Sequence, residues 1–365
     1  MSGVMMTKTT SLYLDGFRTA AALAVFLAHS TDKEITGNLF FSHLGIFGDD
    51  AVMAFFVLSG YVIAYTADAK HGTLGDYVIG RLSRLWSVAL PALALTAAID
   101  YVVRHEFGAD TVPLRGDSPY GYGLSALFMN QVWFLSIFPG SNTPFWSLSY
   151  EAFYYAFFAA VYYLSARARW LAALAILVIA GPKIAALLPL WLLGVLAYRL
   201  SRRELGRAFG WWLWIGSLVG IRIYYAAHAK LAIDRLLPTA DPLDGYINPQ
   251  LGAKCLFSVL IFMNITGFQV IGSKFSRPIL AAEKWLRLGA RHSFSLYLYH
   301  APLLVLFAAM TRSGHGRWWS IAIIYVGTIS IVAVLAPLTE ARKGVLSAIL
   351  RRMTRHPTRP LATHG

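Results

Sequence analysis

Arg18 and His29 are the first residues whose types and spacing suggest chemistry. They bound the apolar stretch "RTAAALAVFLAH". Eleven residues make nearly three helical turns, so both side chains would share one face, about 16.5 Å apart along the axis. Asp15 would lie one turn before Arg18. A histidine there could act as a general base near neutral pH. The alternative is that Arg18 reaches a membrane surface and His29 caps the helix end.

A second pair, Arg81 and Arg84, lies in the stretch "RLSRLW". Residues three apart share one helical face. We expect the pair at the mouth of a helix, where two guanidinium groups could hold phosphates in bidentate fashion. The alternative is an ordinary basic flank of a membrane span.

Glu151 enters an otherwise apolar helix in the stretch "FWSLSYEAFYY". Ser147, Ser149 and Glu151 are too close together to share one face, so at most two of them can face the same pocket. A buried carboxylate needs a partner or takes up a proton. An imidazole or an arginine across a groove would supply that partner, which favours a functional role for Glu151.

A second histidine, His300, lies in the stretch "SFSLYLYHAPLL" with Pro302 beyond it. Tyr297 lies one turn earlier on the same helical face. Pro302 is expected to loosen the backbone nearby. A structural, hydrogen-bonded histidine is as good an interpretation of His300 as a catalytic one.

The composition indicates which elements must position these residues. The chain has 365 residues, of which 57% are hydrophobic and 14% are charged. A soluble domain averages about 25% charged residues, so this composition predicts an all-α, polytopic transmembrane helical bundle. The single cysteine, Cys255, excludes an internal disulfide. No Cys/His spacing resembles a zinc site, and we expect no metal.

About ten helices are predicted, because that many apolar segments approach the length of roughly 20 residues that crosses a bilayer. The stretch 122–138 is also apolar and could be a re-entrant or interfacial helix. Ser59 and Gly60 are small and favour close helix packing. The predicted spans are 11–29, 44–65, 85–103, 146–164, 169–181, 184–200, 209–227, 252–272, 293–310 and 318–338.

The distribution of basic residues predicts the orientation. Most of the 32 Lys and Arg residues fall in loops on the side of the N-terminus, which places both termini in the cytoplasm. This placement also accounts for most of the net charge of +14 without nucleic acid. We expect one transmembrane domain over 1–340 and a basic cytoplasmic tail over 341–365.

Five stretches in this order resemble the acyltransferase-3 family of bacterial membrane acyltransferases. Each motif is weak alone, whereas the ordered set is specific, and it extends from Leu14 to about Leu338. Some relatives also carry an SGNH esterase-like domain, which we do not expect here. The stretches are "LDGFR…H", "FFVLSG", "RLSR", "FWSLSYE" and "SFSLYLYH".

The resemblance implies an enzyme that transfers acetyl or another short acyl group from acyl-CoA to a hydroxyl group. The expected acceptor is a cell-surface glycan or a glycolipid precursor, and the alternative is a small natural product such as a macrolide. The expected location is the inner membrane of a bacterium. Its expected partners are acyl-CoA, a lipid-linked saccharide and membrane lipid, without nucleic acid.

The resemblance also implies roles for individual residues. His29 matches the catalytic position of the family, with Arg18 in the same groove. Arg81 and Arg84 match its Arg-x-x-Arg element, and together with Arg18 they are expected to bind the donor. Glu151 is expected to orient or charge-balance the histidine.

Four further residues are expected to bind substrate. They lie in or beside the matched motifs and are Trp146, Ser149, Tyr297 and His300.

One position departs from the family. Many members carry an aspartate two residues before the first Phe of "FFVLSG", where this chain has Met53. If that aspartate orients the histidine in relatives, then Asp49, Asp50 or Glu151 must do so here, or nothing does.

The residues and the resemblance fit one scheme. His29 takes the proton of an acceptor hydroxyl that attacks the thioester, or His29 is itself acylated and passes the group on. The rival class is a proton-coupled transporter, because buried Arg, Glu and His also suit a proton relay. Its weakness is that the sequence shows no internal repeat of the kind found in many transporters.

Overall fold

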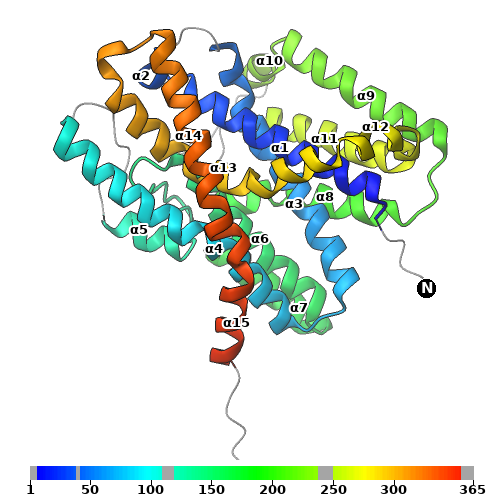
Figure 1. The fold of residues 1–365 in the computed structure, drawn as a ribbon. Helices are drawn as coiled ribbons and strands as arrows, with labels where there is room; N and C mark the ends of the chain where they lie inside the picture. The colour runs from blue at the N-terminus through cyan, green and yellow to red at the C-terminus, as the bar shows by residue number, and fades with distance from the viewer. Residues whose placement is uncertain (1–5, 38–41, 109–118, 237–249, 355–365) are drawn as a thin grey trace, which may run out of the picture.

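The computed structural model describes residues 6–37, 42–108, 119–236 and 250–354. Within these residues every regular element is a helix and no strand occurs. The predicted all-α helical bundle is confirmed (Figure 1).

Helices occupy all of the predicted spans. Their bounds are α1 (Lys8–Ser30), α3 (Gly48–Lys70), α4 (Leu74–Val102), α6 (Trp146–Tyr163), α7 (Ala166–Ala180), α8 (Pro182–Ser201), α9 (Arg207–Ala226), α11 (Leu251–Ile271), α13 (Glu283–Met310) and α14 (Trp318–Thr339).

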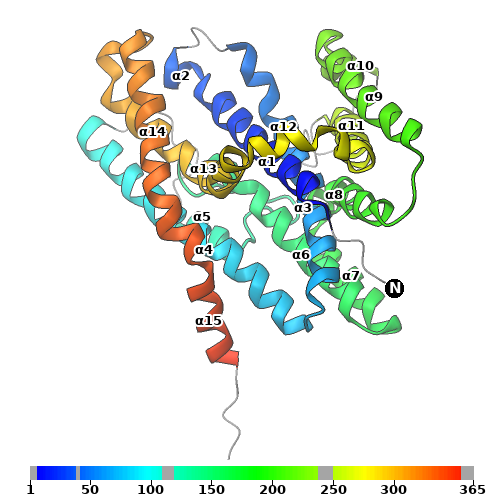
Figure 2. The ribbon, with the colours of Figure 1, turned by 45° about the vertical axis from the view of Figure 1, so that its right-hand side comes forward.

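Shorter helices connect them. Within the apolar stretch 122–138, the structure shows the end of α5 followed by turns rather than one continuous helix. The helix α15 continues α14 in nearly the same direction (Figure 2). The shorter elements are α2 (Lys33–Thr36), η1 (Ser42–Phe47), η2 (Val103–Phe107), α5 (Pro119–Ala126), η3 (Thr143–Phe145), α10 (Ala229–Leu236), η4 (Gly272–Phe275), α12 (Ser276–Ala281), η5 (Arg312–Gly314), η6 (Glu340–Arg342) and α15 (Lys343–Thr354).

Seven helical stretches are long and apolar enough to cross a membrane, judged by length and composition. They contain α1, α3, α4, α8, α11, α13 and α14. The helices α6, α7 and α9 form where spans were predicted but fall outside this set. One reason is length, because α7 has only 15 residues, fewer than the roughly 20 that span the hydrocarbon core.

Two helices, α4 and α13, begin about ten residues before their predicted starts. A capping box starts α4, in which the Thr73 side chain accepts from the Asp76 backbone and the Asp76 side chain accepts from Thr73. This cap adds about three turns before residue 85, so Arg81 and Arg84 lie inside the helix and not at its mouth. The helix α13 begins at Glu283, ten residues before the predicted start at 293, and its first turns carry charged residues.

The helices α3 and α8 cross at two glycines. A Cβ atom at Gly60 would collide with the carbonyl oxygen of Trp191, and one at Gly194 would collide with that of Val57. The two backbones therefore approach as closely as small residues allow. The packing role predicted for Gly60 is confirmed.

Pro302 lies inside α13, and the helix continues past it to Met310. Proline has no N–H for the carbonyl four residues earlier, which is that of Leu298. Asn142 fills this place, since its Nδ2 donates to the Leu298 oxygen at 2.9 Å and to Thr96 at 3.1 Å. The carbonyl that Pro302 leaves without its helical donor therefore binds Asn142, and this hydrogen bond ties the loop before α6 to α13.

Candidate functional site

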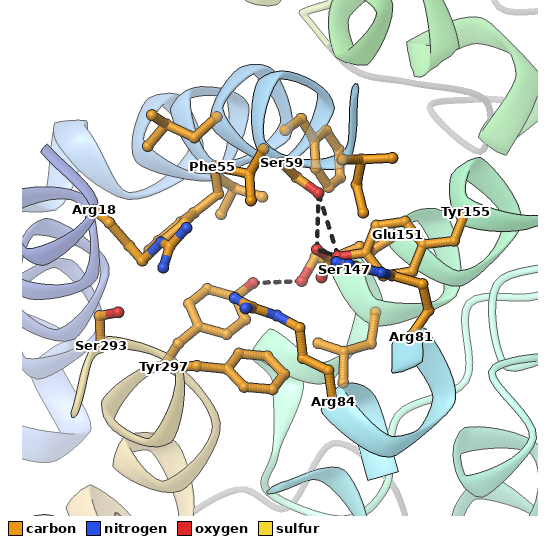
Figure 3. Close-up of a pocket in the computed structure, with 17 residues that line it drawn as sticks. Arg18, Phe55, Ser59, Arg81, Arg84, Ser147, Glu151, Tyr155, Ser293 and Tyr297 are labelled. Atoms are coloured by element: carbon orange, nitrogen blue, oxygen red, sulfur yellow. Dashed lines mark hydrogen bonds between the residues drawn. The ribbon is translucent and has the colours of Figure 1, made fainter. Parts of the chain in front are cut away.

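A cavity lies where α1, α3, α4, α6 and α13 converge; we call it the inner cavity. Figure 3 shows Arg18 entering it from α1, Arg81 and Arg84 from α4, and Glu151 from α6. Four residues expected from the sequence to act together therefore line one cavity.

Hydrogen bonds fix Glu151 on one wall of the inner cavity. Its Oε1 accepts from the Ser59 hydroxyl at 2.9 Å and from the Tyr155 hydroxyl (Figure 3). Two hydroxyl donors satisfy much of what a carboxylate needs when it leaves water. These two hydrogen bonds fix the Glu151 carboxylate in the cavity that Arg81 and Arg84 also line.

The two arginines of α4 are held differently. Arg81 donates to the Thr66 hydroxyl at 3.2 Å and lies 5.6 Å from the centre of the Tyr77 ring. The Arg84 guanidinium lies 5.9 Å from the Phe294 ring centre. Aromatic faces attract cations, so both groups are oriented while most of their N–H donors stay available for a ligand.

A second cavity, the outer cavity, shares Arg18 and Arg84 with the inner one. The shared residues make the two spaces neighbours. Five basic side chains line the outer cavity against two acidic ones, and this excess of positive charge favours anions. The basic residues are Arg18, Arg84, Arg287, Arg291 and Lys343, and the acidic ones are Asp15 and Glu340.

A third cavity contains His29, and we call it the histidine cavity. Trp146, Asp49 and Lys230 also line it, and Lys230 lies 3.4 Å from Asp49. Tyr297 lines both this cavity and the inner one. Its hydroxyl contacts Ser147 at 2.7 Å and donates to the Pro144 oxygen at 3.0 Å, so the ring is held between the two spaces.

Two of the four residues expected to bind substrate lie elsewhere. Ser149 and His300 are both 0% exposed and line none of the three cavities. The Ser149 hydroxyl donates to Asn130. Their direct contact with substrate therefore finds no support in this arrangement, because the side chains are packed behind the cavity walls.

The acids considered as partners of His29 are separated by the structure. Glu151 lines the inner cavity and not the histidine cavity. Asp50 is buried and accepts from Tyr225 at 3.0 Å. Only Asp49 among the three lines the cavity of His29.

Several residues of the site were missed by sequence reasoning. From the sequence, Arg287, Arg291 and Lys343 contribute only to the basic residues that predict orientation, yet they line the outer cavity. The available signal was helical spacing: Arg287 lies one turn after Glu283, with the charged groups 3.0 Å apart, and Arg291 follows one turn later. Ser59 was assigned to packing, whereas it also donates to Glu151. The described residues contain no cluster of His, Cys, Asp and Glu suited to a metal.

Comparison with known proteins identifies the family of the chain. Acyltransferase MdmB of Streptomyces mycarofaciens is 34% identical over 151 residues, which cover 40% of this chain and 37% of that protein. No solved structure matches the chain. The profile of the acyltransferase-3 family, described as an acyltransferase domain, matches residues 11–337. That range contains every predicted site residue from Arg18 to His300, and the chain belongs to the acyltransferase-3 family.

Proposed function

We propose that this protein is a membrane O-acyltransferase that moves an acetyl or other short acyl group from acyl-CoA to a hydroxyl of a cell-surface glycan or glycolipid precursor. The observation that carries the proposal is the series of cavities. Arg18 and Arg84 join the outer cavity to the inner one, and Tyr297 joins the inner cavity to that of His29.

The outer and inner cavities suit the two ends of acyl-CoA. The nucleotide end carries several phosphate charges, which match the excess of basic groups in the outer cavity. The inner cavity has a largely apolar wall that includes Phe55, Val62 and Leu148, and it would take the pantetheine arm. Arg84 lies at the boundary, where the diphosphate would bind.

In this proposal His29 is the general base. The acceptor hydroxyl gives its proton to the imidazole, and its oxygen forms a bond to the thioester carbonyl carbon. The carbon–sulfur bond then breaks, and the CoA thiolate takes the proton back. In the alternative, an imidazole nitrogen of His29 attacks the thioester carbonyl carbon first, the carbon–sulfur bond breaks, and the CoA thiolate leaves with the imidazole proton. The acceptor hydroxyl then attacks the acyl-imidazole, the acyl–nitrogen bond breaks, and the hydroxyl proton returns to His29.

The position of Glu151 supports a role on the donor side. It faces Arg81 and Arg84 across the inner cavity, so we propose that it balances their charge instead of orienting His29 directly. Trp146 and Asp49 lie beside His29, and we propose that they contact the acceptor, because sugars offer hydroxyls to carboxylates and apolar faces to aromatic rings.

We further propose that the protein spans the inner membrane with both termini in the cytoplasm. The support is the excess of basic residues in the loops on that side. Alkaline phosphatase fused to the C-terminus should be inactive in living cells, and an active fusion would contradict this orientation.

The function is tested with purified protein in lipid nanodiscs. Radiolabelled acetyl-CoA is supplied with a cell-envelope extract as acceptor, and both thiol release and label transfer are measured. We expect label in the glycan or glycolipid fraction together with stoichiometric thiol. If acetyl-CoA is never consumed, and the protein in liposomes instead moves protons, the transporter class is the correct one.

A further inference from the structure

His300 is buried directly behind the histidine cavity. Its side chain is 0% exposed, and the centre of its ring lies 5.3 Å from that of His29. It lines none of the three cavities, so a contact with substrate does not explain why an ionisable group occupies this position.

The hydrogen bonds of His300 define its tautomer. Nδ1 lies 2.9 Å from the carbonyl oxygen of Leu296, and a carbonyl oxygen only accepts. Nδ1 therefore carries the hydrogen. Burial away from water disfavours the doubly protonated, charged ring, so Nε2 keeps a free lone pair.

Nε2 of His300 has no hydrogen-bond partner among the described residues. A buried acceptor without a donor is uncommon in folded proteins and calls for an explanation. A donor on a neighbouring side chain that can turn towards Nε2 would satisfy it.

The ring neighbours of His300 leave one candidate. Phe26 meets the ring edge-on at 6.2 Å and has no donor. Tyr297 lies 6.3 Å away, but its hydroxyl donates to Pro144. His29 is the remaining ring. A hydrogen bond of about 2.9 Å between two ring nitrogens corresponds to ring centres about 5 Å apart, close to the observed separation.

We propose that Nε2 of His300 accepts a hydrogen bond from His29 and so positions it for catalysis. This inference rests on the proposed role of His29 as the base. The bond fixes which nitrogen of His29 carries the hydrogen and leaves the other free for the acceptor proton. When His29 becomes an imidazolium, the neutral His300 continues to accept, and no carboxylate has to be buried beside it.

Other charged groups line the cavity of His29. Asp49 faces the same cavity and pairs with Lys230 at 3.4 Å, and Asp32 lines the cavity from the residue after the C-cap of α1. These groups line the cavity of His29, whereas His300 is buried and lines none of the three cavities. His300 is thus separate from the groups that face the cavity.

The test separates the two nitrogens of His300. His300→Asn keeps a donor near the Nδ1 position and loses the acceptor at Nε2, whereas His300→Gln places an amide oxygen near Nε2. We expect His300→Asn to lower kcat about 10- to 100-fold, as loss of a supporting partner commonly does, with little change in the KM for acetyl-CoA. His300→Gln should recover much of the kcat.

The matched control is His105→Asn. The Nδ1 of His105 makes the same contact with a carbonyl one turn earlier, that of Tyr101 at 2.9 Å, on an exposed residue outside the three cavities. It should leave kcat unchanged. Equal losses in His300→Asn and His300→Gln, or a normal kcat in His300→Asn, would show that His300 is only a packing residue.

A second measurement does not depend on whether the variants fold. In wild-type protein with ¹⁵N-labelled histidine and bound CoA, the Nε2 resonance of His300 should show a hydrogen-bonded acceptor. A resonance typical of a free nitrogen would overturn the proposal. If instead His29→Ala remains active, it is the proposed function that fails, so the two failures are distinct.

Discussion

Arg84 is the residue on which two cavities meet. With Arg18 it lines both the outer and the inner cavity, while Arg81 lines the inner cavity alone. Residue types and spacing were enough to single out Arg18, Arg81 and Arg84 as candidate site residues. The same signals did not single out Arg287 or Arg291, because an arginine in an expected loop cannot be told from a residue that only sets membrane orientation until the helix around it is known.

The first prediction concerns the donor. Arg81→Ala and Arg84→Ala should raise the KM for acetyl-CoA, because each removes a charge-assisted contact worth roughly 1.5–3 kcal/mol, or about 10- to 150-fold in affinity. Steady-state kinetics in nanodiscs measure the change. Arg277→Ala, an exposed arginine outside the three cavities, is the control. Unchanged KM and kcat in both α4 variants would leave these arginines without a role in donor binding.

At the scale of elements, hydropathy found the apolar part of each helix and missed the polar turns. The predicted span at 293–310 is the apolar end of α13, whose first ten residues carry Lys284, Arg287 and Arg291. Likewise the cap at Thr73 starts α4 well before residue 85. The outer cavity is built from these polar turns, which is why it could not be located from apolar segments alone.

The crossing of α3 and α8 provides a prediction about stability. Gly194→Val should lower the melting temperature in detergent, because its side chain would collide with the carbonyl of Val57 and overpacking costs about 1–3 kcal/mol. Gly80→Ala is the control, since a Cβ there meets nothing within 4 Å. A Gly194 variant as stable as the control would mean that the helices are not in close contact at this point.

Tyr297 gives a prediction about the barrier between cavities. Tyr297→Ala should increase thiol release that is not accompanied by acyl transfer, because removal of the ring opens the inner cavity to water from the histidine cavity. The measurement is the ratio of free thiol to acylated product in the nanodisc assay. A ratio equal to that of the wild type would show that Tyr297 does not separate donor from solvent.

At the scale of the whole molecule, three neighbouring cavities form a series from the basic outer cavity, through the inner cavity, to the cavity of His29. The helical bundle itself was predictable, because composition and apolar segment length decide it. It was not predictable that Glu151 and His29 line different cavities, because this depends on how α1, α6 and α13 are arranged in space. The burial of Ser149 and His300 outside the three cavities was not predictable either, because a motif does not reveal which side of a helix faces a cavity.

The outer cavity predicts a dependence on the nucleotide end of the donor. Arg291→Ala should raise the KM for acetyl-CoA but change the KM for acetyl-pantetheine little, because the shorter donor has no phosphate to bind there. Competition by CoA and by dephospho-CoA should differ less in the variant than in the wild type. Equal effects on both donors would place the nucleotide elsewhere.

The central claim is that His29 carries the acid–base or acyl-transfer step, and one substitution tests it most directly. Label transfer from acetyl-CoA is measured for His29→Ala in nanodiscs, with folding checked by size-exclusion profile and His105→Ala as control. A general base contributes about 10²- to 10⁴-fold in rate, so transfer should fall by at least about 100-fold, and His29→Gln should not restore it because an amide cannot take up the proton. A variant that keeps more than about a tenth of the wild-type rate would contradict the account.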